Sequence, residues 1–201
     1  MEKNENKWSV RDVISAVLLS AVLIVIQVVV TMVTMANHFI SMVLSVGIIT
    51  LLCGPVYCLL VSRVRKRGVS LVYMTILGLI YLLMGNWYLL IYFILVGILC
   101  EAVLWKKGSF QSPWRITAAW TTASFLYNGI NLLPIWFFWD TYYRFALSSG
   151  MEQAYIDSYR NYYTSPKWLI FILLFSTLCG FIGSRVGSGL MSKHFKKSGV
   201  L

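Results

Sequence analysis

Six apolar blocks, each about as long as a helix that crosses a lipid bilayer, dominate this chain of 201 residues. Such a crossing needs roughly 20 apolar residues. The chain is 59% hydrophobic and 12% charged, whereas a soluble domain carries about 25% charged residues. The sequence therefore predicts an all-α membrane protein with one integral membrane domain over 1–201. We expect its six spans at 12–36, 39–61, 69–85, 87–105, 114–138 and 167–191.

Two of these blocks allow another interpretation. The third is short and is joined to the fourth by "GNW" alone, so a re-entrant hairpin is the alternative there. The first could be taken for a secretory signal, but it is too long for the apolar region of one and lacks a small-residue cleavage site. We therefore expect the first block to remain as a helix.

Basic residues predict the orientation of the chain. Six crossings place all four basic clusters on one side, and the positive-inside rule makes that side cytoplasmic. Both termini are then cytoplasmic in a multi-pass protein of the cell (plasma) membrane, and the connection 139–166 lies outside. The net charge of +10 is thus a topology signal, and we expect contact with the lipid bilayer and no nucleic acid. The clusters are Lys3, Lys7 and Arg11; Arg63, Arg65, Lys66 and Arg67; Lys106, Lys107 and Arg115; and Lys193, Lys196 and Lys197.

The connection 139–166 is unusually long for a small membrane protein and is rich in tyrosine. Loops of this length are usually functional or disordered, and the aromatic content favours order. We expect a short interfacial helix near 150–162. It would either lie across the outer mouth of the bundle or form an aromatic belt at the headgroup level, and both alternatives stay open.

Polar residues follow helical spacing in two of the expected spans. In the fifth span, steps of four, three, four and three place five of them on one face, which must point into the bundle because lipid cannot solvate it. In the first span, a second polar face carries Gln27, which lies about 21 Å above Val13. Asn128 lies roughly 20 Å from the cytoplasmic end of its helix. The two faces are Thr117, Thr121, Ser124, Asn128 and Asn131, and Ser20, Gln27, Thr31 and Thr34.

Carboxamides at matched depth predict a binding site for a small polar solute, open to the outside. Neutral amides donate and accept hydrogen bonds and so orient such a molecule. The alternative is that each amide only holds helices together, a contribution of about 1 kcal/mol. The candidate substrate-binding residues are Gln27, Thr31, Asn128, Asn131, Ser124, Tyr127 and Trp87.

Nothing in the sequence predicts an enzyme, a metal site or a cofactor. There is no HExxH, GxSxG or Walker A sequence, so the chain carries no nucleotide-hydrolysing motor of its own. The four cysteines lie in expected spans without ligand spacing and are read as packing residues. Glu101 lies alone in the fourth span, and we expect it to form an ion pair with Arg115 or Arg185, with a proton-relay role as the alternative.

Small residues four apart predict surfaces that accept another helix closely. Ala16 and Ser20 form one such pair in the first span, and Gly183 and Gly187 form another in the sixth. We assign these four residues to a partner interface.

Several stretches together resemble the Trep-Strep family of integral membrane proteins, which is also described as MptD-like substrate-binding (S) components of energy-coupling factor (ECF) transporters. The resemblance covers nearly the whole chain. The stretches are "KWSVRDVI", "GPVYCLLVSRVRKRGV" at 54–69, "LLMGNW" at 82–87 and "MSKHFKKSGV".

The resemblance implies an S-component-like bundle of six helices that captures a micronutrient-like solute from outside. It also implies partners: a transmembrane coupling subunit and two cytoplasmic ATPase subunits that drive an ABC-type importer. An AxxxA-like motif contacts the coupling subunit in such proteins, and the matching positions here are Ala16 and Ser20. No substrate residue is implied.

Two other functions remain open at this stage. The runner-up is a non-transport membrane scaffold whose polar residues only pack helices. A self-contained secondary transporter is third, because it would usually have an embedded acid near the midplane, and Glu101 lies too near the cytoplasm.

Overall fold

Three long apolar helices provide the main membrane-crossing length of the protein. The computed structural model describes residues 7–192 and contains α1 (Val10–Thr34), α2 (Ser45–Val64) and α9 (Pro166–Leu190). A π-helical turn, Ile40–Leu44, runs directly into α2, so the two form one segment of 25 residues. Each of the three segments is long and apolar enough to cross a membrane, as expected for the first, second and sixth spans.

Two shorter apolar helices stand where the third and fourth spans were expected. They are α3 (Val69–Leu83) and α4 (Trp87–Val103), and they pack against each other along their length. At 15 and 17 residues they reach roughly 22 and 26 Å, a little less than the about 30 Å of a hydrocarbon core.

The expected fifth span, 114–138, is divided into two helices, α5 (Pro113–Leu126) and α6 (Gly129–Phe137). The amide of Asn128 donates to the carbonyl oxygens of Ser124 (3.4 Å) and Phe125 (3.0 Å), which competes with continuation of the helix. Gly129 follows directly and has low helix propensity. The chain therefore changes direction between α5 and α6.

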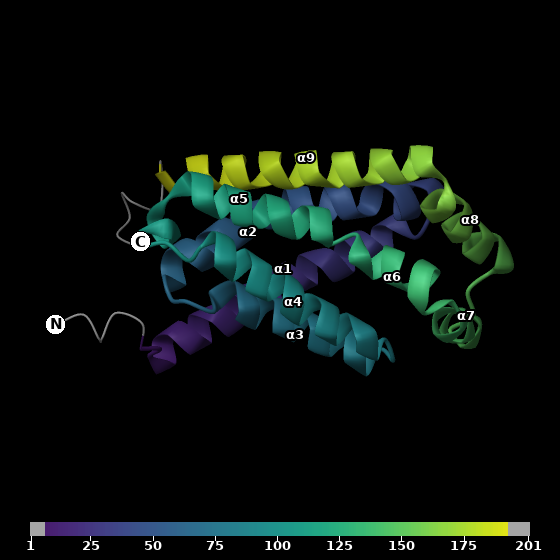
Figure 1. Ribbon diagram of the computed structural model, residues 1–201, viewed down its shortest axis with the longest axis horizontal. Coiled ribbons are helices and arrows are strands. Elements are labelled where there is room, and N and C mark those ends of the chain that lie inside the picture. The colour runs from purple at the N-terminus through teal and green to yellow at the C-terminus, as the bar shows by residue number, and fades with distance from the viewer. Residues whose placement is uncertain (1–6, 193–201) are drawn as a thin grey trace.

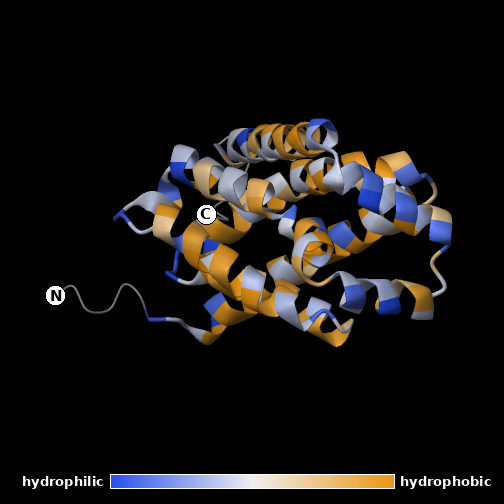
Figure 2. Ribbon diagram, turned by 45° about the vertical axis from the view of Figure 1, so that its right-hand side comes forward, coloured by the Kyte–Doolittle hydropathy of each residue, from blue (hydrophilic) through white to orange (hydrophobic). Residues whose placement is uncertain are grey.

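The connection expected outside contains two helices, α7 (Trp139–Ser148) and α8 (Gln153–Thr164). The helix predicted near 150–162 is confirmed as α8, and α7 is additional. In Figure 1, α6, α7 and α8 gather at one end of the bundle, while α1 begins and α9 ends at the other. Hydrophilic residues concentrate at these two ends and hydrophobic ones cover the helices between them (Figure 2).

Local signals explain where the helices begin. Ser9 and Asp12 form a reciprocal capping box at the start of α1, which satisfies two backbone N–H groups that a helix leaves unpaired. Pro113 and Pro166 are the first residues of α5 and α9, where the missing N–H costs nothing. The charged residues Lys3, Lys193, Lys196 and Lys197 lie outside the described part of the chain.

The centre of the bundle is α2, which packs against α9 and α1. Its approach to α9 is close because Gly54 and Gly183 face each other. A Cβ built on Gly54 would lie 2.4 Å from the backbone carbon of Gly183. The buried core beside this contact is aromatic: Trp120 stacks on Tyr57 with ring centroids 4.5 Å apart and donates to the carbonyl oxygen of Thr50 at 2.9 Å.

Candidate functional site

A cavity of about 120 Å³ lies where the end of α1, the π-helical turn and the helices α6 to α8 meet. We call it the tyrosine cavity. It draws side chains from segments that are far apart in the sequence, and hydroxyl and phenol groups predominate among them. Its lining residues are Thr31, Ser41, Met42, Ser45, Val46, Ile49, Tyr81, Tyr127, Ile130, Asn131, Tyr142, Tyr155 and Tyr159.

Hydrogen bonds fix α8 against the body of the bundle and so place its tyrosines over the cavity. The phenol of Tyr163 donates to the carbonyl oxygen of Met42 at 2.8 Å, and the amide of Asn131 donates to the Tyr163 oxygen at 2.7 Å. Tyr159 donates to the backbone carbonyl of Asn131. Ser41 and Tyr155 share a hydrogen bond of 2.8 Å. These contacts join α6, α8 and the π-helical turn.

The π-helical turn is the local feature that presents Ser41 and Ser45 on this side of the chain. A π turn widens the helix and often occurs at functional sites. Ser45 donates to the carbonyl oxygen of Ser41, so its hydroxyl is oriented by the turn itself.

The tyrosine cavity is electrically neutral. No charged side chain is among the described residues that line it. Burial raises the pKa of Tyr142, Tyr155 and Tyr159 above the ordinary value of a phenol, so these groups stay protonated at neutral pH. Tyr142 and Tyr159 also lie with ring centroids 4.8 Å apart. The cavity therefore offers hydrogen bonds and aromatic surface without a counter-ion.

Three of the residues predicted to bind substrate line this cavity: Thr31, Tyr127 and Asn131. Gln27 does not line the cavity but is hydrogen-bonded to Tyr127, which does. Its carbonyl oxygen accepts from the Tyr127 phenol at 2.8 Å, and its amide donates to the phenol of Tyr73. Gln27 is buried, so it contacts the cavity only through the Tyr127 phenol that it orients.

The other three predicted binding residues lie elsewhere. Asn128 is fully buried and donates to the Ser176 hydroxyl of α9 at 2.7 Å, while Ser124 donates to the carbonyl oxygen of Trp120. Trp87 is half exposed at the start of α4 and packs edge-on against Phe138. Neither Asn128, Ser124 nor Trp87 is among the cavity residues, so the carboxamides do not all converge on one space.

The four small residues assigned to a partner interface are covered by the chain itself. Ala16 and Ser20 are fully buried. A Cβ added to Gly183 would lie 2.2 Å from the backbone oxygen of Leu51, and one added to Gly187 would lie 2.5 Å from the Cα of Pro55. The small side chains thus permit close packing within this chain, and the surface they were expected to offer is not free here.

Glu101 caps a helix. Its carboxylate oxygens accept from the backbone N–H groups of Gly68 and Ser70, both at 2.8 Å, at the start of α3. The two arginines expected as its ion-pair partners make other contacts: Arg115 donates to the Ser109 hydroxyl, and Arg185 lies over the ring of Trp114. A carboxylate at a helix N-terminus is stabilised by the unpaired N–H groups and the helix dipole.

The cavity residues of α7 and α8 were not predicted from the sequence. The usable signal was the spacing of Tyr155, Tyr159 and Tyr163, which recur every four residues and therefore share one helical face. Ser41 of the π-helical turn and Ser45 at the start of α2 carried no comparable signal, because serine is a common residue in apolar helices.

Comparison with known proteins identifies a family without adding a described function. No curated protein and no solved structure matches the chain. The model of the Trep_Strep family, described as hypothetical bacterial integral membrane proteins, matches residues 10–197. That range includes every helix described above. The chain is therefore a multi-pass bacterial integral membrane protein and belongs to the Trep_Strep family.

Proposed function

We propose that this protein is the substrate-capturing subunit (S component) of an ECF-type importer, and that the tyrosine cavity holds a small uncharged solute taken up from outside. The observation that carries the proposal is the cavity itself, lined by neutral hydrogen-bonding groups beneath α7 and α8. The family resemblance in the sequence supports the same role.

The chemistry of the lining defines the class of solute. Phenols, hydroxyls and the Asn131 amide recognise a molecule with several neutral donors and acceptors. The adjacent rings of Tyr142 and Tyr159 suit a flat or aromatic part of that molecule. A strongly charged solute would find no opposite charge among the lining residues.

Uptake in this proposal involves movement of α7 and α8. The cavity of about 120 Å³ is smaller than the roughly 300–1,000 Å³ of typical ligand sites, so the two helices swing outward to admit the solute. Energy for transport comes from a transmembrane coupling subunit and two cytoplasmic ATPases. Because Ala16, Ser20, Gly183 and Gly187 are covered, the coupling subunit contacts other residues in this conformation.

The test is retention of a solute. Native mass spectrometry of the protein purified from its own membranes identifies the bound molecule, and its affinity is then measured for variants. We expect Asn131→Leu and Tyr159→Phe to weaken binding about tenfold or more, since each removes a hydrogen-bonding group from a residue that lines the cavity. Tyr162→Phe is the matched control, because Tyr162 contacts Phe39 and Trp168 away from the cavity. Unchanged affinity in both cavity variants would refute the site.

A membrane scaffold without transport is the second candidate. It is favoured by the amides of Gln27 and Asn128, which are engaged in contacts between helices. A scaffold would gain no thermal stability from any small solute, whereas a binder gains about 2.7 kcal/mol at 100 times its dissociation constant. Co-purification with a coupling subunit and ATPases would favour the S component over the scaffold.

A further inference from the structure

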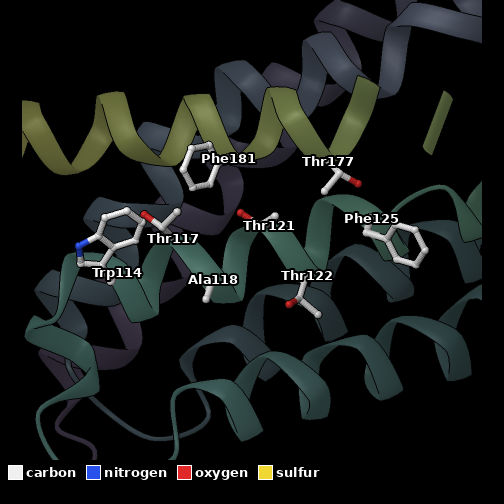
Figure 3. Close-up of a pocket in the computed structure, with 8 residues that line it drawn as sticks. All are labelled: Trp114, Thr117, Ala118, Thr121, Thr122, Phe125, Thr177 and Phe181. Carbon is white, nitrogen blue, oxygen red and sulfur yellow. The ribbon is translucent and has the colours of Figure 1, made fainter. Parts of the chain in front are cut away.

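A second concave surface, unrelated to the tyrosine cavity, lies between α5 and α9 (Figure 3). We call it the α5–α9 groove. It has a volume of about 460 Å³ and shares no lining residue with the tyrosine cavity. Its walls are aromatic rings and threonines at helical spacing: Trp114, Thr117, Ala118, Thr121, Thr122, Phe125, Thr177 and Phe181.

The groove lies on the outer surface of the helix bundle. Trp114, Phe125 and Phe181 are 63%, 46% and 37% exposed. From Trp114 to Phe125 the helix rises roughly 16 Å. Half of a hydrocarbon core of about 30 Å is about 15 Å, so the groove is as long as one leaflet of the bilayer is thick.

Two threonine hydroxyls at this groove lack hydrogen-bond partners. Thr117 is 1% exposed, and its Oγ1 has no hydrogen-bond partner. The Oγ1 of Thr121, one turn further along α5, also has no hydrogen-bond partner. An unpaired hydroxyl in an apolar setting is costly. Threonine in a helix populates two side-chain rotamers, so a rotation about χ1 turns either hydroxyl toward an acceptor in the groove.

Positive charge lies at the Trp114 end of the groove. The guanidinium of Arg185 lies 4.2 Å from the centre of the Trp114 ring, and no acidic side chain among residues 7–192 pairs with it. The same end is the start of α5, where Ser112 makes no side-chain cap. Pro113 has no N–H and the N–H groups of Arg115 and Ile116 bond to the carbonyl oxygen of Ser112, so this helix N-terminus adds the N–H of Trp114 and a partial positive charge. A cation at the edge of a bilayer is attracted by anionic lipid headgroups.

We propose that the α5–α9 groove binds one anionic phospholipid. The phosphate pairs with Arg185 at the start of α5, where the helix dipole also favours an anion. The ester carbonyls, which follow the phosphate in a phospholipid, accept hydrogen bonds from Thr117 and Thr121. An acyl chain then passes Thr121 and lies along Phe125, while Phe181, whose ring centroid is 6.5 Å from that of Trp114, flanks the hydroxyls (Figure 3). The order of the charge beside Trp114, the hydroxyls of Thr117 and Thr121 and the apolar ring of Phe125 matches the order of groups in the lipid.

The test compares two lipids on the intact protein. The protein in detergent is titrated with dioleoylphosphatidylglycerol or dioleoylphosphatidylcholine, and native mass spectrometry measures the retained lipid. We expect phosphatidylglycerol to be preferred about tenfold, the effect of one charge-assisted hydrogen bond. Arg185→Gln abolishes this preference. Arg144→Gln is the matched control, since Arg144 is exposed on α7 at the other end of the bundle.

Further variants test the hydroxyls and the source of the anion. Thr117→Val with Thr121→Val, which keeps the side-chain shape, is expected to weaken retention of both lipids, while Thr164→Val on α8 has no effect. Inorganic phosphate at millimolar concentration does not displace the lipid if the acyl chain is bound as well. Equal retention of the two lipids by the parent, or equal behaviour of Arg185→Gln and Arg144→Gln, overturns the proposal. Displacement by phosphate alone also overturns it in favour of a free-anion site.

Discussion

The phenol of Tyr92, on α4, donates a hydrogen bond to the carbonyl oxygen of Leu126, the last residue of α5. That carbonyl loses its helical partner where α5 ends, so the phenol replaces a bond that the break removes. Gly129 makes the contact sterically feasible: a Cβ at this position would lie 2.2 Å from the Tyr92 ring. The break between α5 and α6 therefore depends on α4.

Gly129→Ala should destabilise the fold by an amount typical of overpacking, about 1–3 kcal/mol. The added methyl group displaces Tyr92 and with it the hydrogen bond to Leu126. Thermal unfolding in detergent measures the change. Gly189→Ala is the matched control because nothing lies within 4 Å of a Cβ added there, and it should be neutral or slightly stabilising. Equal effects of the two substitutions would contradict this account of the break.

Glu101→Ala should destabilise the protein by about 2–3 kcal/mol. The substitution removes two hydrogen bonds from the carboxylate to the N–H groups of Gly68 and Ser70, and bonds to charged acceptors are stronger than neutral ones. Glu101→Gln keeps one acceptor and should lose less. Glu152→Gln, on the exposed connection before α8, serves as control. If both substitutions of Glu101 leave the unfolding midpoint unchanged, the carboxylate does not stabilise α3.

Substitutions of Asn128 and Asn131 should have different effects, one on the stability of the fold and the other on solute binding. Asn128→Ala removes the contact between the α5–α6 break and Ser176 of α9 and should cost about 1 kcal/mol without changing solute affinity. Asn131→Leu should weaken solute binding, because Asn131 lines the tyrosine cavity. Unfolding and ligand titrations on both variants decide this. If Asn128→Ala loses solute affinity at unchanged stability, Asn128 contributes to binding and this prediction is wrong.

Alkaline pH should destabilise the protein through its buried phenols. Burial raises the pKa of Tyr142, Tyr155 and Tyr159 above 10.0 in the folded state. Their stabilisation is fully present below pH 10, where the unfolded chain also keeps its phenols protonated, and it is lost as pH rises through the higher folded values.

Unfolding midpoints between pH 8 and 11 measure this loss. Above pH 10, the unfolding midpoint of Tyr142→Phe should fall less than that of the parent, because the substitution removes one phenol with a raised pKa. The lost hydroxyl makes only a 4.0 Å contact with the Met151 sulfur, so its removal has little other effect. A decline of the parent that begins well below pH 9, or that is identical in Tyr142→Phe, would argue against the phenols as its cause.

Helix positions were predictable because the apolar blocks are long and bounded by turns. Five expected spans agree with α1, the segment Ile40–Val64, α3, α4 and α9 within a few residues. The break in 114–138 was not predicted, since hydropathy averages over a window and does not register one asparagine that bonds to its own backbone. Periodicity alone placed Asn128 and Asn131 on the same face, and the break then turned them toward different neighbours.

The candidate site was only partly predictable for a related reason. Buried amides point inward whether they face a cavity or another helix, so Gln27 and Asn128 gave the same sequence signal as Asn131. Small-residue pairs have the same ambiguity: Gly183 fits a partner helix and its own α2 equally well. For Gly183, only the packing of α2 against α9 distinguishes the two possibilities.

The tyrosines that cover the cavity from α7 and α8 all come from the continuous stretch 139–164. This arrangement has an evolutionary consequence. A single recombination event that exchanges this stretch between two relatives would replace the roof of the cavity and leave α1 to α5 and α9 intact. Under the proposed function, selectivity for new solutes would then diversify without remodelling the part of the protein that the bilayer surrounds.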